Sequence, residues 1–539
     1  MADHEVPVLI VGGSLVGMST ALLLGHHGVR ALAVEHHRGT AIHPRAAQVS
    51  QRTMEIFRQV GLEPIVRERS GEQFVQDGAI MAVETLAGRE LAYFIANLNE
   101  GIRDVSPTER VFISQSLLEP LLESRAQGLG ATLRFGTDMV AFEQDADGIT
   151  ATIRDRDTGR EETVRAAYMV AADGAHSRVR ETLGIGTTGR GTFSKSVTIY
   201  FRANVAPLLR GRNLSVIYVN HPELRGFFRF EKPFDSGFLA VNGLGDPDHP
   251  VTDVTTDLSE QRCLEWIRLA LGDADIPVTV QNVMPWDAAA DVAERLQDRR
   301  VFLAGDAAHV MPPNGGFGGN TGVQDAHNLA WKLAMVLRGE ASGHLLRSYE
   351  TERQPVGAFT TEQAYTRYVT RTAPYLGTDG LQPAAHDLAV ELGYLYRSSA
   401  ICDEDGPHGP LHEHPHESGG RPGSRAPHVW MDVQGTTSTL DLFGRRFVLL
   451  AGAGAGAWCE AAHAAGHRLG LDVAVRRLDE TLGGPDGAVV SAYGLSPAGA
   501  SLVRPDGFVG WRSATAEADL DSSVAAIAHA LSAMTGRTA

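Results

Sequence analysis

Residues 301–337, VFLAGDAAHVMPPNGGFGGNTGVQDAHNLAWKLAMVL, are the stretch around which this chain is organised. The apolar residues 301–304 predict a short strand, which turns at Gly305 and Asp306, crosses a glycine-rich loop and leads into a long amphipathic helix. An acid at such a turn is placed to hydrogen-bond a sugar-like polyol, and the glycines let backbone N–H groups approach a ligand. Because a helix N-terminus also carries partial positive charge, the stretch predicts part of a cofactor site.

The N-terminus predicts a βαβ unit of the kind that binds dinucleotides. Residues 6–11 are continuously apolar, as expected for a parallel strand buried on both faces, and residues 31–35 predict a second strand that ends in an acid. An apolar helix is expected between them, over residues 18–25. The turn before that helix contains the glycines Gly12, Gly13 and Gly17.

Two residues of this unit concern the ligand directly. Glu35 lies near the offset of about 20 residues at which an acid binds an adenosine ribose. Ser14 stands at the second position of the glycine pattern, where glycine normally lets a pyrophosphate approach and where serine is one of the least bulky replacements. Taken alone, this turn is also compatible with an ordinary tight connection between a strand and a helix.

Residues 168–180, YMVAADGAHSRVR, form a second informative motif. A strand is expected to end at Asp173, and a helix to begin near Ser177 with Arg178 and Arg180 in its first turn. The helix dipole disfavours cations at that end, so the pattern indicates an anionic partner or a buried acid. A capped helix with surface arginines is the alternative.

The remaining chain predicts a second and a third structural unit. Residues 194–244 are rich in β-branched and aromatic residues, which favours an antiparallel sheet half exposed towards a ligand cavity. The composition shifts near residue 400 to a loop rich in Gly, Pro and His, followed by a small terminal α/β unit. The loop histidines could bind a metal, but a solvated loop is favoured and no metal site is predicted. They are His412, His414 and His416.

Composition excludes several classes of protein. The net charge is −17, with 48 basic and 65 acidic residues, which argues against a nucleic-acid surface because counterion release needs clustered Lys and Arg. Residues 6–25 are nearly long enough to span a bilayer, but acidic residues precede them and their glycines follow a strand–turn–helix order, so no membrane segment is expected. Three widely separated cysteines indicate neither a disulfide framework nor a zinc site, and a reducing, cytoplasmic location is expected.

Together, GGSLVG, DGAHSRVR and GDAAHVMPPNGGFGGNTGVQDAHNLAWKL resemble the three signatures of the class A flavoprotein aromatic hydroxylases. HPRA, RTMEIFR, STLDLFGRRFVLL and LVRPDGFVGWR extend the resemblance over nearly the whole chain. They are similar to the phenol hydroxylase-like polyketide hydroxylases, and within that subgroup to the anthracyclinone hydroxylases. The resemblance implies an α/β fold with an FAD-binding Rossmann-type (GR2-like) domain, a β-sheet substrate domain and a C-terminal thioredoxin-like domain.

The expected domain boundaries follow from this resemblance and from the shifts in pattern. The FAD-binding domain is discontinuous, over residues 1–180 and 275–400, with residues 75–105 lining the substrate site. The substrate-binding sheet occupies residues 181–274, and the thioredoxin-like domain residues 401–539. The terminal domain lacks a CxxC motif, so we expect a structural role for it rather than thiol–disulfide chemistry.

The resemblance also implies a role for each motif. The first turn and Glu35 hold the ADP half of FAD, and Asp306 holds the ribityl hydroxyls. The helix N-terminus after Asp306 presents backbone N–H groups to the flavin pyrimidine edge, where reduced flavin carries negative charge. The implied cofactor-binding residues are Gly12, Gly13, Ser14, Gly17, Glu35, Arg45, Gln115, Asp173, Asp306, Pro313, Gly318, Gly319 and Asn320.

The activity implied by the resemblance is hydroxylation of an aromatic polyketide, an anthracyclinone such as aklavinone. NADPH or NADH reduces the flavin, O₂ adds to form a C4a-hydroperoxide, and oxygen is transferred to an electron-rich ring. A neighbouring hydroxyl or cation would activate the phenol by favouring its ionised form. The candidates are Tyr218, Arg367 and Arg371, for which sheet packing and surface exposure are the alternatives.

Two rival functions stay open at this level. One is hydroxylation of a simple phenol, or of an aromatic antibiotic as a means of drug inactivation. The other is a flavin-binding protein without monooxygenase activity. The hydroxylated carbon, the choice between NADPH and NADH, and the choice between monomer and homodimer do not follow from the sequence.

Overall fold

The computed structural model describes residues 2–42, 48–243, 245, 253–402, 404, 406, 409–479, 483–484 and 487–537. These residues form three sheets of four or more strands, each with helices packed on it, and a two-stranded ribbon of β3 (Gln48–Val49) and β6 (Val111–Phe112). None of the helices in these ranges is long and apolar enough to cross a bilayer.

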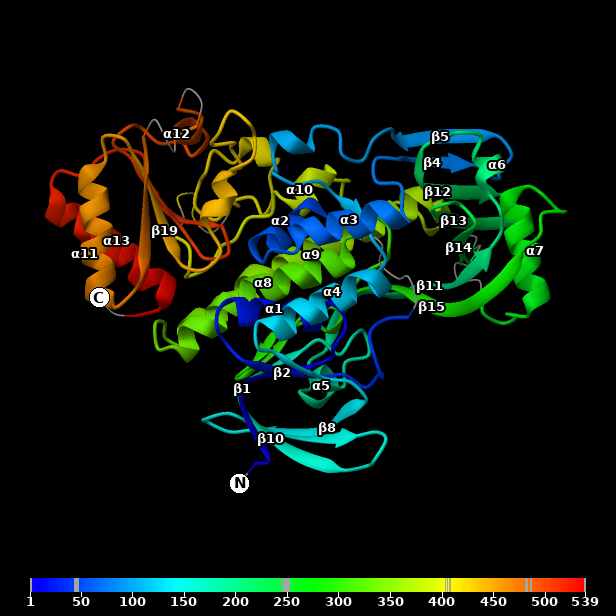
Figure 1. Ribbon diagram of the computed structural model, residues 1–539, viewed down its shortest axis with the longest axis horizontal. Helices are drawn as coiled ribbons and strands as arrows, with labels where there is room; N and C mark the ends of the chain where they lie inside the picture. Colours follow the sequence, from blue (N-terminus) through cyan, green and yellow to red (C-terminus); the bar gives the residue numbers. More distant parts are fainter. Residues whose placement is uncertain are drawn as a thin grey trace.

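The first sheet is mostly parallel and lies at the lower centre of Figure 1. Strand β1 pairs in parallel with β10 and β2, and β10 pairs in parallel with β17. Residues 8–11 are each at most 7% exposed, which explains why this strand is a continuous apolar run. The strands are β1 (His4–Val11), β2 (Ala31–Val34), β7 (Thr132–Arg134), β8 (Thr137–Gln144), β9 (Ile149–Asp155), β10 (Glu161–Ala171), β16 (Gln297–Asp298) and β17 (Val301–Leu303).

Four long helices cover this sheet, and two of them, α1 and α8, are the helices predicted over residues 18–25 and in the stretch 301–337. Helix α1 contacts both α4 and α8, and α8 contacts α9. The shared core includes Leu22, Leu118 and Leu329, all at most 1% exposed. The helices are α1 (Leu15–His26), α4 (Gln115–Gly128), α8 (Gly318–Leu337) and α9 (His344–Arg371).

The second sheet, on the right of Figure 1, is mainly antiparallel and confirms the expected β-rich segment. Its outer face packs on α7 (Glu260–Leu271) through the buried Trp266 and Ile267. The early strands β4 and β5 join it through a parallel pair between β12 and β4. Its strands are β4 (Ala79–Val83), β5 (Glu90–Ile95), β11 (Thr187–Arg202), β12 (Leu214–His221), β13 (Leu224–Glu231), β14 (Ser236–Asn242), β15 (Thr279–Ala293) and β18 (His309–Val310).

Strand β15 bears on the predicted domain boundary at residue 275. It pairs with β11 from Thr279 to Ala293, so it belongs to the second sheet by hydrogen bonding. The chain therefore passes from one sheet to the other after β15 rather than before it. The physical reason is that β15 supplies the long antiparallel partner that β11 needs on its open edge.

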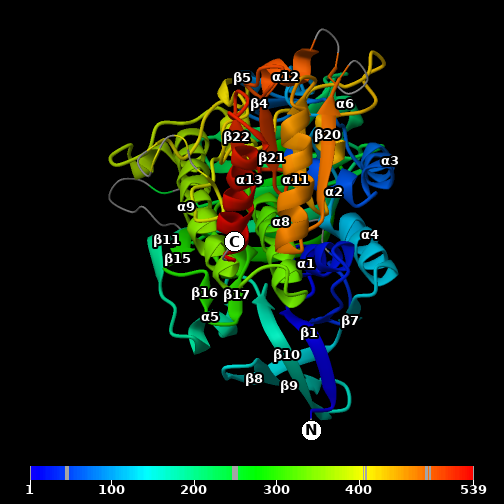
Figure 2. The same ribbon diagram turned by 90° about the vertical axis from the view of Figure 1, so that its left-hand side faces the viewer.

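The third sheet, on the left of Figure 1, has the strand order β20-β19-β21-β22. Helices α11 and α13 lie side by side against it, as Figure 2 shows with this side of the molecule towards the viewer. Its core continues into Trp331 and Met335 of α8, so the terminal domain packs directly on the helix that begins in the glycine-rich motif. The elements are β19 (Phe447–Gly452), α11 (Gly456–Leu469), β20 (Val473–Leu478), α12 (Ala488–Ala492), β21 (Ala500–Val503), β22 (Val509–Ser513) and α13 (Leu520–Thr535).

A buried ion network joins this terminal domain to helices α8 and α9. Arg504, after β21, donates to both carboxylate oxygens of Glu352 in α9, at 2.6 and 3.0 Å. Lys332 in α8 donates to the same carboxylate at 2.8 Å, and all three side chains are fully buried. Removing one partner from such a network leaves an uncompensated buried charge, which is strongly destabilising.

Shorter elements connect these units. They are α2 (Gln51–Gln59), α3 (Glu63–Gln73), α5 (Arg178–Thr182), α6 (Ala206–Leu209) and α10 (Asp387–Glu391).

Candidate active site

The three sequence motifs meet at one edge of the first sheet. Strands β1, β2, β10 and β17 run in parallel, so their carboxyl ends lie at the same edge, where ligands bind in open α/β sheets. Gly12 follows β1, Glu35 follows β2, Asp173 follows β10 and Gly305 follows β17. The structure thus brings together residues that are up to about 290 positions apart in the chain.

Two positions of the first turn, Gly12 and Gly17, have room for glycine only. Gly12 has a φ of +101°, and a Cβ added to it would lie 2.2 Å from the carbonyl oxygen of Ala172. A Cβ on Gly17 would lie 1.8 Å from the carbonyl oxygen of Gly12. These contacts hold the start of α1 close to the strand ends, as a pyrophosphate site at a helix N-terminus requires.

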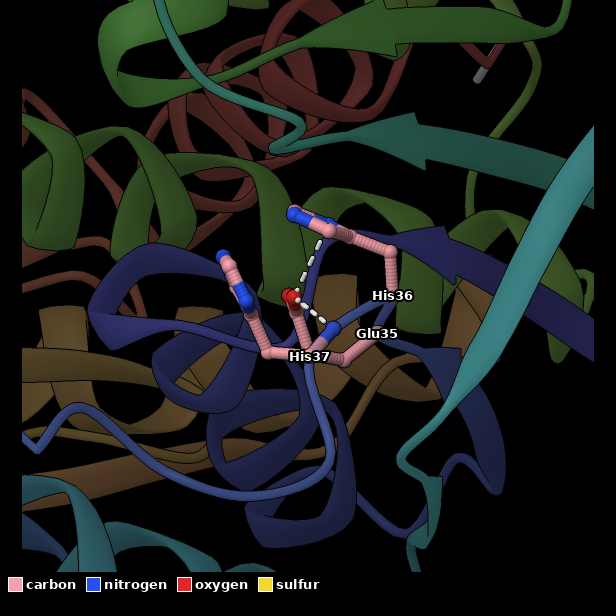
Figure 3. A group of neighbouring side chains, drawn as sticks. All are labelled: Glu35, His36 and His37. Atoms are coloured by element: carbon pink, nitrogen blue, oxygen red, sulfur yellow. Dashed lines mark hydrogen bonds and ion pairs between the residues drawn. The ribbon is translucent and has the colours of Figure 1, made fainter. Parts of the chain in front are cut away.

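Glu35 is held by the turn and by the two histidines that follow it, which Figure 3 shows around its carboxylate. Its Oε2 accepts a hydrogen bond from the Gly13 N–H at 2.7 Å, and its Oε1 accepts one from the His37 N–H at 2.9 Å. His36 Nδ1 lies 3.0 Å from the same Oε1. The carboxylate is therefore held at the end of β2, at the place expected for an acid that binds a ribose.

The same three residues are also the group that could hold a metal ion. One ligand atom from each of Glu35, His36 and His37 lies within 4.8 Å of the others, and within the described ranges no other trio does so. Both oxygens of the carboxylate already accept backbone hydrogen bonds, and both imidazoles are exposed. We interpret the group as part of the nucleotide site, because Glu35 stands at the end of β2, where an acid binds a ribose in dinucleotide-binding sheets.

Ser14, the residue that departs from the glycine pattern, is tied to helix α4. Its hydroxyl donates to Glu119 Oε1 at 2.6 Å and accepts from Gln115 Nε2 at 2.7 Å. Glu119 is almost fully buried, and its other oxygen accepts from the Ala41 N–H at 2.6 Å. The sequence reasoning missed Glu119, although its spacing of four residues from Gln115 places both on one helix face. The predicted Arg45 lies outside the described residues.

Asp173 and Arg180 connect two of the motifs. The Asp173 carboxylate accepts from the Ser177 hydroxyl at 2.6 Å and from the Val179 N–H at 3.2 Å, so it caps the short helix α5. Arg180 donates to the carbonyl oxygens of Ala175 and Ala307, each at 3.1 Å. The described partners of Arg180 are thus backbone oxygens of both motifs rather than a buried acid, and an anionic partner for Arg178 or Arg180 stays a prediction.

The turn that carries Asp306 is fixed by a buried acid that the sequence reasoning did not select. Asp325 in α8 accepts from the Gly305 N–H at 3.0 Å and from Arg353 Nε at 2.7 Å. His309 Nε2 lies 2.7 Å from the same carboxylate. Burial alone would raise the pKa of Asp325, but His309 and Arg353 outweigh it and hold the pKa below its usual value.

The first turn of α8 faces the site with its backbone. No side chain in the described ranges caps this end, so the first N–H groups are available to a ligand. The Asn320 side chain accepts from the Ser50 N–H at 2.9 Å and from the Thr53 hydroxyl at 2.7 Å. It also donates to the carbonyl oxygen of Gly316 at 2.7 Å. Because these hydrogen bonds occupy the amide of Asn320, its backbone N–H is the group left to bind the edge of a ligand ring.

A cavity of about 1080 Å³ lies between this backbone and the second sheet. One wall contains the predicted residues Asp306, Pro313, Gly318, Gly319 and Asn320. The opposite wall is the inner face of the sheet and is strongly aromatic. It includes Tyr200, Tyr218, Phe227, Arg229, Phe238 and Trp286.

The three predicted catalytic residues differ in their surroundings. Tyr218 and Arg371 line the cavity, and Phe94 contacts both: its ring centroid is 5.7 Å from that of Tyr218 and 5.7 Å from the Arg371 guanidinium carbon. Arg367 does not line it. Its guanidinium donates to Asp387 at 2.6 Å and to the carbonyl oxygens of Gln363 and Ala385. The two arginines share a helix but only Arg371 can reach a ligand in the cavity.

Comparisons with known proteins agree with this geometry. Residues 5–364 match the model of the FAD binding domain family, and residues 419–538 match that of the aromatic-ring hydroxylase C-terminal family. The chain is 52% identical to a 4-methyl-5-nitrocatechol 5-monooxygenase from Burkholderia sp over 95% of this chain and 94% of the relative. It is 41% identical to a tetracenomycin A2 monooxygenase-dioxygenase from Streptomyces glaucescens, with 95% and 94% covered.

A solved structure extends the likeness to the whole fold. Aklavinone-11 hydroxylase, in a ternary complex with FAD and aklavinone, superposes with a TM-score of 0.92 at 38% identity, and each chain is covered completely. The resemblance to anthracyclinone hydroxylases, including the C-terminal thioredoxin-like domain, is thereby confirmed. With its motifs joined at one sheet edge beside an aromatic cavity, this chain belongs to the FAD-dependent aromatic hydroxylases.

Proposed function

We propose that this enzyme uses FAD and NAD(P)H to hydroxylate a phenolic ring that binds between the N-terminus of α8 and the second sheet. The observation that carries the proposal is the single cavity that joins Asp306 and Gly318 to Tyr218. A flavin bound along the first wall would face an aromatic ring held against the second.

The residues present fit FAD. The glycine-only turn and Glu35 suit the ADP half, Asp306 suits a polyol, and the free N–H groups at the start of α8 suit the flavin pyrimidine edge. Bound there and reduced by NAD(P)H, the cofactor supplies activation of O₂ and an electrophilic oxygen. The protein supplies orientation, exclusion of water, and charge.

Tyr218 and Arg371 are the groups that we propose activate the substrate. Electrophilic oxygen attacks an ionised phenol more readily than a neutral one, so a hydrogen-bonding hydroxyl and a nearby cation favour reaction. Tyr218 is 7% exposed and belongs to the cavity wall, and Arg371 ends α9 at the same cavity. Arg367 is the weaker candidate because Asp387 and two carbonyl oxygens occupy its guanidinium.

An aromatic polyketide with fused rings is the substrate class that we propose first. The cavity of about 1080 Å³ has to hold the flavin ring as well as the substrate, and its volume lies at the upper end of the range of about 300–1,000 Å³ for ligand sites. The structural neighbour that binds aklavinone matches the chain over its whole length. An anthracyclinone such as aklavinone is therefore the first compound to test.

A substituted catechol with one ring is the second candidate. It is favoured by the 52% identity to a nitrocatechol monooxygenase, which exceeds the 39% identity to an aklavinone 12-hydroxylase over comparable coverage. The two candidates share the chemistry of an electron-rich ring that a phenol oxygen activates towards an electrophile. They differ in how much of the cavity the substrate fills.

The test is a substrate panel with FAD-loaded enzyme. Aklavinone, tetracenomycin-type phenols, 4-methyl-5-nitrocatechol and phenol are compared by NADPH and NADH oxidation and by product mass. Hydroxylation at a carbon that carries hydrogen adds one oxygen atom to the mass of the substrate, whereas attack at C5 of 4-methyl-5-nitrocatechol replaces the nitro group by oxygen and releases nitrite. Tyr218→Phe should lower turnover while FAD content is unchanged. Tyr93→Phe, at an exposed tyrosine of β5, is the matched control. Rapid NADPH loss without any change of product mass for every compound would contradict the proposal.

A further inference from the structure

Strand β5 is the outermost strand of the second sheet, at the upper right of Figure 1. Within the described ranges it pairs with β4 and with no other strand. Its large exposed apolar side chains are Leu91, Tyr93 and Phe94, which are 39%, 55% and 39% exposed. The ring of Phe94 contacts two residues of the cavity wall, so this side chain links the outer strand to the proposed substrate site.

A β-bulge explains why Phe94 points towards the cavity. Tyr93 and Ile95 pair with consecutive residues of β4, so Phe94 between them is an extra residue. In a regular ladder Phe94 would lie opposite Met81, whose side chain packs under α7 on the outer face of the sheet. The bulge interrupts this alternation, and the Phe94 ring meets Tyr218 on the cavity face instead. Bulges beside active sites commonly redirect a side chain in this way.

Phe94 touches both groups that we propose activate the substrate. Its ring forms an edge-to-face pair with that of Tyr218, with centroids 5.7 Å apart and planes at 90°. The guanidinium carbon of Arg371 lies over the same ring, 5.7 Å from its centroid. Both partners line the cavity. Phe94 therefore bridges the sheet wall and the C-terminal end of α9.

Arg371 is a side chain whose position has to be fixed by its neighbours. It is the last residue of α9, and an arginine side chain has many rotamers of similar energy. A ligand that has to order such a side chain binds less tightly, because the lost conformational entropy opposes binding. The face of an aromatic ring attracts a guanidinium, so the Phe94 ring holds the charge in place before a ligand arrives.

Asp387, in the short helix α10, also acts on Arg371. Burial would raise the pKa of Asp387, but nearby arginines, Arg371 among them, hold it below its usual value. The Asp387 carboxylate already accepts a hydrogen bond from Arg367 at 2.6 Å. Without the Phe94 ring, the remaining attraction would draw the Arg371 guanidinium towards α10. The ring is thus the contact that keeps this charge near Tyr218.

We propose that Phe94 is a positioning residue, which holds the Arg371 guanidinium at the place where the phenolate of the substrate binds. This inference rests on the proposed function and adds to it a residue that acts through Arg371. The bulge in β5 gives Phe94 its position, and the ring face supplies the attraction. An ionised ligand therefore depends on Phe94, whereas a neutral ligand of the same shape does not.

The experiment compares the binding of ionised and neutral ligands to FAD-loaded enzyme. The ionised probes are 4-nitrocatechol and 1,8-dihydroxyanthraquinone, each titrated above its own phenol pKa and followed by its visible absorbance. The neutral probes are their O-methylated forms, which cannot ionise, followed by the change in flavin absorbance. Phe94→Leu removes the ring face and keeps an apolar side chain, and Phe94→Tyr keeps the face. Tyr93→Leu, at the exposed neighbouring aromatic residue, is the matched control.

The expected result is a loss confined to the ionised probes. Phe94→Leu should weaken their binding about two- to fivefold, as expected for a partly exposed contact between a cation and a ring. The neutral probes should bind as they do to the wild type. Phe94→Tyr should restore the affinity, and Tyr93→Leu should behave like the wild type. In the Arg371→Met background, Phe94→Leu should have no further effect, because the ring acts through the guanidinium.

The outcomes that overturn the inference separate it from the proposed function. If the wild type hydroxylates a phenol but Phe94→Leu binds both kinds of probe like the wild type, or weakens both equally, the positioning role is wrong and the proposed function stands. The same conclusion follows if the effect of Phe94→Leu persists in full in Arg371→Met. If the wild type neither binds nor hydroxylates any phenol, both proposals fail together. Because Phe94 is 39% exposed, the variants should fold, and their FAD content checks this.

Discussion

Asp325, in the middle of α8, accepts a hydrogen bond at 3.0 Å from the backbone N–H of Gly305, the first residue of the turn that carries Asp306. The same carboxylate is held by Arg353 from α9 and by His309 from β18. The cofactor turn is thus positioned by three elements that follow it in the chain. Its geometry depends on how α8 and α9 pack, not on the turn alone.

Asp325→Asn should therefore loosen the FAD site and destabilise the protein. The variant leaves Arg353 buried without its counter-charge, which costs about 3–5 kcal/mol. Urea unfolding of FAD-saturated protein and flavin absorbance after gel filtration measure the two effects. Asp472→Asn, in the exposed pair with Arg446, is the control and should change stability by at most about 1 kcal/mol. Equal behaviour of the two variants would refute the role of Asp325.

Asp306→Ala should yield protein that does not retain FAD, because we assign this carboxylate to the ribityl hydroxyls. The readout is the flavin absorbance of the purified protein. The fold should persist, since Asp306 is exposed at the cavity rather than packed in the core. A fully yellow variant would contradict the assignment.

Gly17→Ala should also abolish FAD binding, for a steric reason. The new Cβ would lie 1.8 Å from the carbonyl oxygen of Gly12, so the start of α1 must move away from β1. Gly71→Ala is the control, because a Cβ there meets nothing within 4 Å. FAD titration by flavin fluorescence quenching compares the two, and tight FAD binding by Gly17→Ala would show that the turn can relax.

Arg504→Met should detach the terminal domain from α8 and α9. It removes the cation that shares Glu352 with Lys332, at a cost of about 3–5 kcal/mol for a broken buried pair. Limited proteolysis should then cleave between the domains before either is degraded. Arg446→Met, at an exposed ion pair of the terminal domain, should leave the proteolysis pattern of the wild type.

Because His428 is buried, the free energy of unfolding should fall in mild acid. Burial, reinforced by Arg425, lowers the pKa of His428 to about 3, against 6.5 for the unfolded chain. Between these two pKa values the imidazole is protonated in the unfolded state but not in the folded state. The contribution of His428 to the free energy of unfolding is therefore fully present above pH 6.5 and falls as the pH drops towards 3. The slope is about 1.4 kcal/mol per pH unit.

The test compares urea unfolding at pH 7.5 and pH 5.5. The wild type should lose about 1.4 kcal/mol more than His428→Asn over this interval, because only the wild type carries the buried imidazole. His463→Gln, on the exposed side of α11, should keep the pH dependence of the wild type. Identical pH dependence in His428→Asn would show that this imidazole is solvated when the chain is folded.

The prediction for the cofactor half followed from local chemistry. A glycine turn, an acid at a strand end and a helix N-terminus can each be recognised from a few consecutive residues, and each indicates ligand binding. Glu35 and Asp306 could therefore be selected before their surroundings were known. The catalytic half could not be assigned in this way. Arg367 and Arg371 are equivalent in the sequence, four residues apart, and only their different neighbours separate them.

The sequence by itself determined the family and the presence of an aromatic sheet, and it predicted the three motifs that the structure brings to one sheet edge. It could do so because these features depend on short motifs and on the alternation of side chains along a strand. The tertiary structure alone decided which acids hold the cofactor turn, how Arg504 joins the terminal domain to α8, and that Arg229 faces the cavity. Those facts depend on contacts between segments far apart in the chain, and burial and charge pairing exist only once the segments have packed.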